Sequence, residues 1–305
     1  MNHPRLPKSW HDLRKGSLGR LDEYLHEIHE NKNDSRYGEG SVGKMLSKDG
    51  TAIAFDRTGN GPAIILVGGA LSNRSAGAPL AALLASHFTV FTYDRRGRGD
   101  SGDTSHYAVE REVEDIEALI EEAGGSAFLF GHSSGAVLAL EAARLLPTRV
   151  TKLAMYEPPF IIDNSRPPLP ADYQEQLMER LAAGRRGDAV EYFMTDAVGV
   201  PAEILAQMRH SPMWPALERV AHTLPYDATI MGDNMAGNPL PPKQWASVTV
   251  PVLVMDGGAS PAWARNAVQG LTDVLPDARR RTLEGQTHTV APEALAPVLE
   301  EFFEE

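Results

Sequence analysis

The sequence has no cysteine among its 305 residues. Disulfide bonds, thiolate nucleophiles and cysteine-ligated zinc sites are therefore excluded, and nothing in the composition argues for export. Long apolar runs are also absent, since no stretch approaches the roughly 20 residues that cross a bilayer and the first residues lack the apolar centre of a signal peptide. We therefore expect a cytoplasmic protein with no membrane partner.

Basic residues are the minority charge, because 29 Lys and Arg stand against 41 Asp and Glu, a net charge of −12. Such a surface repels nucleic acid and anionic lipid, so neither is an expected partner. The sequence also shows no metal-ligand cluster, cofactor-binding glycine motif or lysine placed for a covalent cofactor, and we predict that no metal and no cofactor is required. His26 and His29, on a predicted helix at 18–29, are typical of a polar helix face and receive no role.

The segment around which the chain is organised is 126–146, reading SAFLFGHSSGAVLALEAARLL. It joins an apolar run to a helical pattern through Gly131-His132-Ser133-Ser134-Gly135, which fits G-x-S-x-G. A turn this tight needs small residues on both sides of the serine, and the two glycines meet that need. The serine would stand at the end of a strand, beside the first N–H groups of the following helix. Ser133 is therefore the predicted nucleophile.

Along the rest of the chain, short apolar runs alternate with helical patterns, which is typical of a parallel sheet with helices on both faces. Strands at 42–46 and 52–56 flank an Asp-Gly turn and predict an antiparallel hairpin at the start. The remaining strands are expected at 62–67, 88–93, 128–130, 150–156, 250–255 and 279–283, with helices at 76–86, 110–122, 261–275 and 292–303. The loop 94–102, DRRGRGDSG, lacks the spacing of a phosphate-binding loop and is predicted to be structural.

Between residues 171 and 245 the patterns are helical only, at 172–183, 188–197, 201–208 and 213–224. This block is too poor in strands to continue the sheet. We predict a helical lid at 161–245, inserted into a core formed by 41–160 and 246–305, with an N-terminal helical extension at 1–40.

The joint order of these motifs resembles the α/β-hydrolase superfamily from residue 42 to residue 303. The pieces are the glycine loop after PAIILV, the DRRGRG loop, GHSSG, an acidic residue ending a later strand and the late histidine of GQTH. The resemblance implies an α/β fold with an eight-stranded, mostly parallel sheet flanked by helices and the lid between strands six and seven. It also implies a catalytic serine, acid and histidine in that chain order. The chain departs from many members in having Gly68-Gly69 where they have His-Gly.

His288 is the predicted base, because a serine hydroxyl needs a neutral imidazole to accept its proton and the family's topology brings this histidine's loop over the turn. His132 adjoins the nucleophile, but in such a turn its side chain points elsewhere, so we predict a structural role. The oxyanion requires two backbone N–H donors. Ser134 supplies one, and either Ala70 or Gly69 supplies the other.

Two carboxylates compete to orient His288. Asp256 ends the VLVMD strand but falls four residues short of the usual acid position, where this chain has Ser260. Glu157 ends the preceding strand in LAMYEPP, 24 residues after the nucleophile, and can reach the same histidine. Some relatives resemble this chain in placing a glutamate there, so Glu157 is the favoured acid and Asp256 the alternative.

These residues predict a serine hydrolase that cleaves a carboxylic ester or lactone through an acyl-serine intermediate. The segments GHSSG, YEPP and GGASP are similar to the lactone hydrolases that open macrocyclic resorcylic lactones such as zearalenone. Two alternatives stay open: a cofactor-free perhydrolase on the same triad, and a small-molecule receptor with a vestigial site. Ser133 excludes the relatives that use an aspartate nucleophile.

Aromatic and thioether side chains in the helical block indicate a small, apolar ester or lactone as the substrate. The candidates for the pocket are Trp214, Met213, Phe193 and Met208, with Trp214 the first choice. About half of such residues are expected only to pack the helices against one another. The sequence predicts no oligomeric state.

Overall fold

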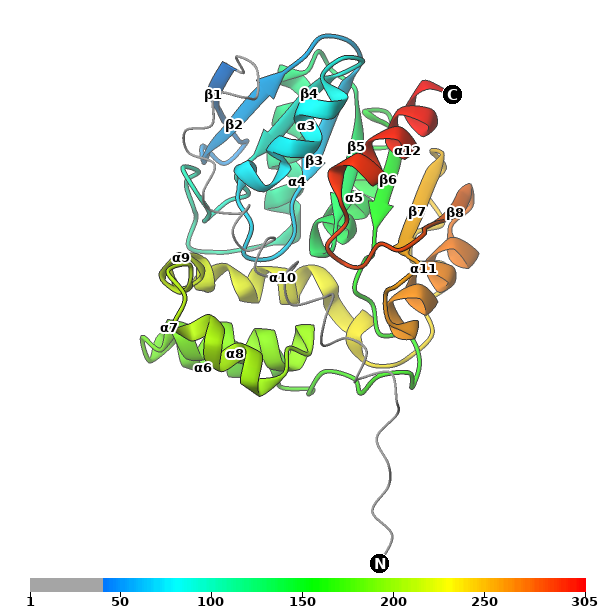
Figure 1. Ribbon diagram of the computed structural model, residues 1–305. Coiled ribbons are helices and arrows are strands. Elements are labelled where there is room, and N and C mark those ends of the chain that lie inside the picture. Colours follow the sequence, from blue (N-terminus) through cyan, green and yellow to red (C-terminus); the bar gives the residue numbers. More distant parts are fainter. Residues whose placement is uncertain (1–40) are drawn as a thin grey trace, which may run out of the picture.

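The computed structural model describes residues 41–305 (Figure 1). The predicted extension at 1–40, with its helix and its two histidines, lies outside the described residues. No helix in the described part combines the length and the apolar character that a membrane crossing requires.

One eight-stranded sheet forms the centre of the molecule, in the order β1-β2-β4-β3-β5-β6-β7-β8. β1 runs antiparallel to β2 and β2 antiparallel to β4, whereas the other pairings are parallel. The predicted hairpin and the mostly parallel eight-stranded sheet are thereby confirmed. The strands are β1 (Ser41–Leu46), β2 (Ala52–Thr58), β3 (Ala63–Val67), β4 (Thr89–Tyr93), β5 (Ala127–His132), β6 (Val150–Tyr156), β7 (Val252–Gly257) and β8 (Ala278–Leu283).

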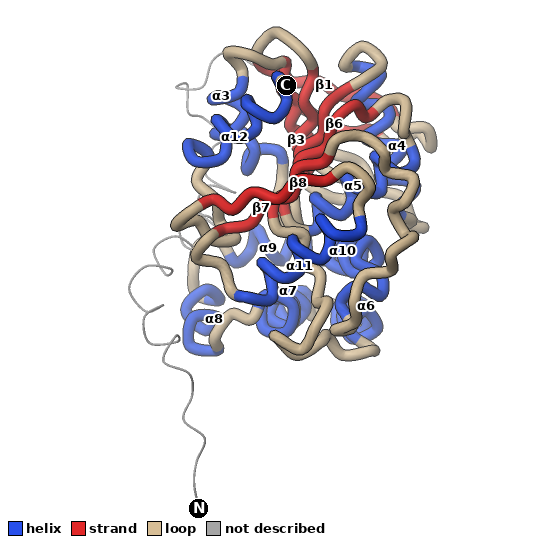
Figure 2. The backbone as a smooth tube through the Cα atoms, turned by 90° about the vertical axis from the view of Figure 1, so that its right-hand side faces the viewer, coloured by secondary structure: helices blue, strands red, loops and turns tan. Residues whose placement is uncertain are grey.

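Helices cover both faces of the sheet, as Figure 2 shows in a view along its edge. Successive side chains of a strand point to opposite faces, so Ile64 packs under α3 (Ala78–Leu84) and α12 (Pro292–Glu304). Its neighbour Ile65 belongs to the other apolar layer, with α4 (Val109–Glu122), α5 (Ser134–Leu145) and α11 (Ala262–Val274). Strands buried on both faces explain why the sequence shows continuous apolar runs rather than alternation.

A helical segment lies between β6 and β7 in the chain and gathers below the sheet in Figure 1. Its members form an apolar cluster that also takes in Leu71, from the loop after β3. The elements are α6 (Tyr173–Ala182), α7 (Arg186–Tyr192), the π-helical turn η2 (Phe193–Val198), α8 (Ala202–Arg209), α9 (Trp214–Val220), the 3-10 turn η3 (Ala221–Thr223), α10 (Leu224–Met231) and the 3-10 turn η4 (Gly232–Met235).

Two details of this segment differ from the sequence-based expectation. The predicted helix at 188–197 is α7 followed by the π-helical turn η2. The predicted helix at 213–224 consists of α9 followed by the 3-10 turn η3. A further helix, α10, follows at Leu224–Met231 and carries a proline in its first turn. Proline fits the first turn, where its missing N–H has no helical partner, so Pro225 begins a new helix there.

Candidate active site

The turn between β5 and α5 holds Ser133 in a strained backbone conformation, with φ 57° and ψ −128°. Neither flanking glycine can carry a side chain. A Cβ on Gly131 would lie 2.5 Å from the Cα of Ala136, and a Cβ on Gly135 would lie 2.3 Å from the carbonyl oxygen of Val67. The G-x-S-x-G spacing is therefore a steric requirement of this turn.

His288 and Glu157 are brought together across 131 residues of chain. The His288 Nδ1 lies 2.8 Å from Glu157 Oε2, and the other carboxylate oxygen accepts the Gly257 N–H at 2.8 Å. Burial alone raises the pKa of the Glu157 carboxyl, but the hydrogen bonds and the charge it receives, above all from His288, hold the pKa below its ordinary value. The Ser260 hydroxyl acts in the same direction without meeting hydrogen-bond geometry to any described residue. Glu157 is therefore an ionised group in contact with the His288 imidazole.

Asp256, the alternative acid, is fully buried and faces another partner. Its Oδ2 accepts hydrogen bonds from Arg280 Nε at 2.9 Å and Nη2 at 2.5 Å. Its Oδ1 has no hydrogen-bond partner within residues 41–305. The same part of the chain shows no contact between this carboxylate and His288, so the geometry favours Glu157 as the orienting acid.

The loop that carries His288 is held against the strand ends beside Ser133. His132 donates its Nε2–H to the His288 carbonyl oxygen at 2.9 Å, and the two imidazole centroids are 4.8 Å apart. Tyr156 donates its hydroxyl proton to the carbonyl oxygen of Thr287 at 2.6 Å. Burial, and secondarily the neighbouring His288, lower the pKa of His132 to about 4, which keeps it neutral at pH 7. The structural role predicted for His132 is thus specific: it fixes the backbone of His288.

No hydrogen bond joins the Ser133 hydroxyl to His288 within the described part of the chain. Such bonds are commonly long in a protein without substrate and tighten when substrate binds. His132 adjoins both residues, since it precedes Ser133 and binds the His288 carbonyl, so serine and histidine share one neighbour.

The predicted oxyanion donors surround the serine. A Cβ on Gly69 would lie 3.0 Å from the Cβ of Ser133, which places this loop directly against the nucleophile. The backbone N–H groups of Gly69 and Ala70 have no acceptor among residues 41–305. Ser134 begins α5, where an N–H group lacks a helical partner. The geometry is compatible with both registers of the second donor, so that choice stays a prediction.

The four predicted pocket residues lie in or against the apolar cluster of the helical segment, together with Ala70. Trp214 is 5% exposed and Met208 is 4% exposed. The indole N–H of Trp214 donates to Glu218 Oε1 at 2.9 Å. Phe193 and Met213 are half-buried, so they present more surface to a ligand than the other two. A substrate pocket there stays a prediction.

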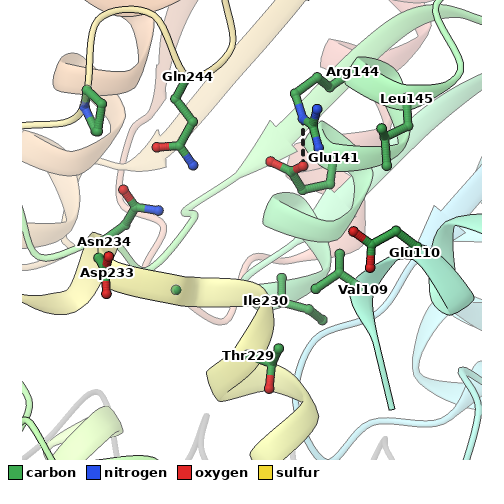
Figure 3. Close-up of a pocket in the computed structure, with 12 residues that line it drawn as sticks. Val109, Glu110, Glu141, Arg144, Leu145, Thr229, Ile230, Asp233, Asn234 and Gln244 are labelled. Carbon is green, nitrogen blue, oxygen red and sulfur yellow. Dashed lines mark hydrogen bonds and ion pairs between the residues drawn. The ribbon is translucent and has the colours of Figure 1, made fainter. Parts of the chain in front are cut away.

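A separate surface cavity of about 320 Å³ lies between α4, α5 and the end of α10 (Figure 3). None of the predicted site residues lines it, and its charged groups include an ion pair between Arg144 and Glu141 at 2.8 Å. Ser133, Glu157 and His288 are not among its lining residues. We therefore assign it no part in the reaction.

The loop 94–102, predicted to be structural, carries arginines that contact the backbone next to the nucleophile. Arg95 donates to the Gly68 carbonyl oxygen at 3.3 Å and Arg98 donates to the Gly69 carbonyl oxygen at 2.6 Å. Both guanidiniums are buried. The available sequence signal was the density of arginine in one loop of an acidic chain, but no local pattern identifies the carbonyls that these arginines reach.

A sequence model described as "Alpha/beta hydrolase family" matches residues 64–300. The solved structure of an alpha/beta hydrolase from Sphaerobacter thermophilus DSM 20745 is 61% identical, with a TM-score of 0.80, and the match covers 86% of this chain and 100% of that chain. The residues matched by the family model, 64–300, include the strand ends described above.

Two more distant comparisons are informative. The uncharacterized hydrolase YraK of Bacillus subtilis (strain 168) is 31% identical over 150 residues, which is 48% of this chain and 55% of that protein, so this chain spans about half of that relative. An enol-lactonase from Burkholderia xenovorans LB400 is 21% identical with a TM-score of 0.64, covering 86% of this chain and 100% of that chain. At 21% identity, this comparison shows a shared fold only.

Proposed function

The chain belongs to the alpha/beta hydrolase family, and from this premise we propose that it hydrolyses a small carboxylic ester or lactone through an acyl-serine intermediate. The observation that carries the proposal is the 2.8 Å contact between His288 and a buried, ionised Glu157, beside the strained Ser133. The enol-lactonase and other hydrolases of the same fold are compatible with this reaction class.

In the first half-reaction, Ser133 Oγ attacks the substrate carbonyl carbon and His288 Nε2 accepts the hydroxyl proton. Nδ1 of the same ring keeps its proton and donates it in a hydrogen bond to Glu157, which stabilises the imidazolium. The carbonyl oxygen becomes an oxyanion facing the Ser134 N–H and the N–H of Ala70 or Gly69. Each donor contributes ~3 kcal/mol in the transition state.

The tetrahedral intermediate then expels the alcohol oxygen, which takes the proton from His288 and leaves an acyl-serine. In a lactone the expelled alcohol stays attached to the acyl group. A water molecule, deprotonated by His288, attacks the acyl carbon, and collapse of the second intermediate returns the proton to Ser133 Oγ. The products are a carboxylic acid and an alcohol.

We further propose the domain organisation predicted from the sequence, in which residues 41–160 and 246–305 form the core and residues 161–245 form a lid over the site. The shared apolar cluster of Leu71, Ala70 and the helical segment supports this placement. An apolar lid favours an apolar small molecule as the substrate. A cytoplasmic location stays a prediction.

The proposal is tested with a fluorophosphonate probe and a panel of esters and lactones. We expect one adduct per chain, mapped by peptide mass spectrometry to Ser133 rather than to the adjacent Ser134, and loss of both adduct and turnover in Ser133→Ala. Absence of an adduct in the unmodified protein would instead indicate a small-molecule receptor.

A further inference from the structure

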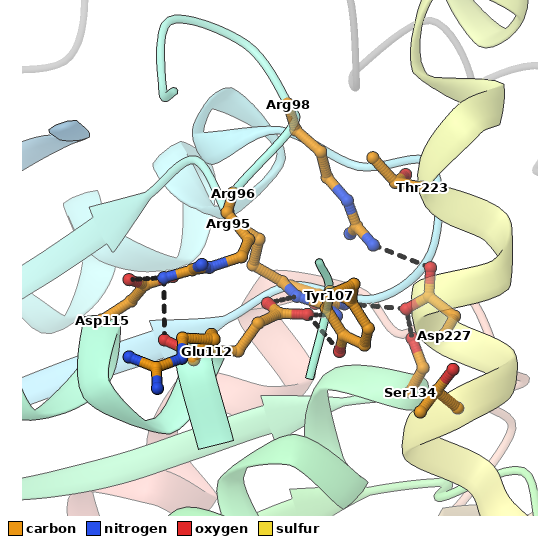
Figure 4. A network of polar contacts seen from close by, with 12 residues as sticks. Arg95, Arg96, Arg98, Tyr107, Glu112, Asp115, Ser134, Thr223 and Asp227 are labelled. Carbon is orange, nitrogen blue, oxygen red and sulfur yellow. Dashed lines mark hydrogen bonds and ion pairs between the residues drawn. The ribbon is translucent and has the colours of Figure 1, made fainter. Parts of the chain in front are cut away.

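The three arginines of the loop after β4 pair with three buried carboxylates, and Arg95 holds the first of them, Glu112 of α4, at 2.6 and 2.7 Å. Arg96 pairs with Asp115 of α4, at 2.7 and 2.8 Å. Arg98, and Arg95 through its remaining nitrogen Nη1, reach Asp227, which comes from α10 of the helical segment, at 2.7 and 2.8 Å (Figure 4). Of these three carboxylates, only Asp227 ties the core to the helical segment, because Glu112 and Asp115 both belong to α4.

The Asp227 carboxylate contacts residues on both sides of the proposed oxyanion hole. Its Oδ1 accepts the Ser134 hydroxyl proton at 2.7 Å, next to the first N–H donor. Its Oδ2 accepts from Arg98 Nη2, and Nη1 of the same guanidinium donates to the Gly69 carbonyl oxygen at 2.6 Å. One carboxylate from α10 thus connects the two loops from which an oxyanion would be bound.

The contact to Gly69 bears on a specific donor. The Gly69 carbonyl and the Ala70 N–H belong to one planar trans peptide unit, in which they point in opposite directions. Arg98, together with the Ser72 hydroxyl at 2.7 Å, draws the carbonyl to one side and therefore aims the Ala70 N–H to the other. A cation on the carbonyl oxygen also polarises the peptide, which strengthens its N–H as a donor.

The charged groups of Asp227 and Arg98 are both buried, and removing charges from water costs free energy. Asp227 is 4% exposed and Arg98 is 1% exposed. Burial by itself raises the pKa of Asp227, but Arg98 and then Arg95 bring it below its ordinary value, so the carboxylate stays charged. A buried ion pair seldom exceeds apolar packing in net stability, whereas it fixes geometry closely.

Resting on the proposed function, we propose that Asp227 and Arg98 are positioning residues that orient the Ala70 N–H, so that docking of α10 completes the oxyanion hole. This assigns the second donor to Ala70 rather than Gly69. It also makes the helical segment part of the catalytic apparatus, in addition to any contact it makes with the substrate.

The test compares Asp227→Asn with Asp115→Asn. An amide cannot accept hydrogen bonds from both arginines and from Ser134 at once, so the first variant lets Arg98 shift away from the Gly69 carbonyl. The second variant breaks an equally buried pair that does not contact this peptide. For Asp227→Asn we expect kcat to fall ~10²-fold, with KM changed less than about threefold. The affinity for a trifluoromethyl ketone, whose adduct carries an oxyanion, should fall in proportion to kcat/KM. For Asp115→Asn, kcat and ketone affinity should stay within about threefold of the unmodified protein.

A second pair, Arg98→Lys and Arg96→Lys, covers the case in which Asp227→Asn does not fold. Lysine keeps the charge but lacks the two-pronged guanidinium, so it cannot hold Asp227 and the Gly69 carbonyl together. We expect at least ~10-fold loss of kcat in Arg98→Lys only. If each variant matches its control in kcat and in ketone affinity, the inference is wrong. Failure of the proposed function is a separate outcome: the unmodified protein would then neither turn over esters nor be labelled at Ser133.

Discussion

Three residues other than glycine adopt a left-handed backbone conformation within residues 41–305, and all three surround the proposed site. They are Leu71 with φ 60°, Ser133 with φ 57° and Glu157 with φ 45°. Each costs roughly 1–3 kcal/mol and persists only where the surrounding structure imposes it. Each follows the end of a parallel strand, so the strain is concentrated at the sheet edge where the nucleophile, the oxyanion loop and the acid meet.

Replacing Glu157 with Gln tests which carboxylate orients the histidine. The Gly257 N–H holds the amide oxygen, so the amide N–H₂ faces His288 Nδ1 and forces that nitrogen to accept. The ring proton then moves to Nε2, where a base must be free to accept one. We therefore expect kcat to fall ~10⁴-fold while the fold persists, measured by steady-state kinetics and circular dichroism.

Asp256→Asn is the matched comparison, because Asp256 is buried, ends the neighbouring strand and binds Arg280 instead. This variant should lose stability through its broken ion pair but keep kcat per folded molecule within about tenfold. Near-normal turnover in Glu157→Gln together with collapse in Asp256→Asn would reverse the assignment.

At the scale of elements, the site is assembled from the carboxyl ends of strands and from one helix of the inserted segment. β3, β5 and β6 run parallel and side by side, so the residues that follow them meet at one edge. α10 approaches the same edge from the other side and presents Asp227 to it. The chemistry therefore depends on an element that is separate from the sheet.

The half-buried residues of the helical segment are expected to contact the substrate. We predict that Phe193→Ala raises KM for bulky apolar esters ~10-fold, with little change for acetyl esters, because it removes apolar contact area. Trp214→Ala should change the same ratio less and lower the free energy of unfolding more, by ~3 kcal/mol, because its side chain is buried. Steady-state kinetics on an ester series and urea unfolding measure the two effects, and equal KM changes for long and short esters would contradict a pocket role.

At the scale of the whole molecule, the sequence predicts the order of strands and helices well because each element carries its own local pattern. The turn at Ser133 is predicted for the same reason, since its glycines are a local steric requirement. The left-handed conformation of Glu157 could not be predicted in this way, because the residue at that position is not a glycine. The contact between Arg98 and Asp227 joins residues 129 positions apart. α10, which supplies the aspartate, begins at Leu224, where the predicted helix ends, and has a proline as its second residue. Long-range partners of this kind are set by packing, which the sequence pattern does not encode locally.

One contribution to the pH dependence of stability should come from the partly buried imidazole of His132. The pKa of His132 falls from 6.5 to about 4 on folding, chiefly because of burial. Above pH 6.5 neither the folded nor the unfolded state protonates this side chain. As the pH falls from 6.5 to 4, the unfolded state takes up a proton that the folded state does not, so the free energy of unfolding decreases by up to ~3 kcal/mol, and below pH 4 this dependence ends.

His132→Gln removes the titrating group, and the variant isolates this contribution from that of every other group. We expect the difference in unfolding free energy between the unmodified protein and the variant, measured by urea titration from pH 7.5 to pH 4, to shrink by ~3 kcal/mol across that range. Tyr156→Phe is the control, because it also removes an anchor of the histidine loop but no group that titrates in this range. It should lower stability by ~1 kcal/mol at every pH. A constant difference for His132→Gln would mean that the ring is as readily protonated in the folded state as in the unfolded one, contrary to its burial against the His288 loop.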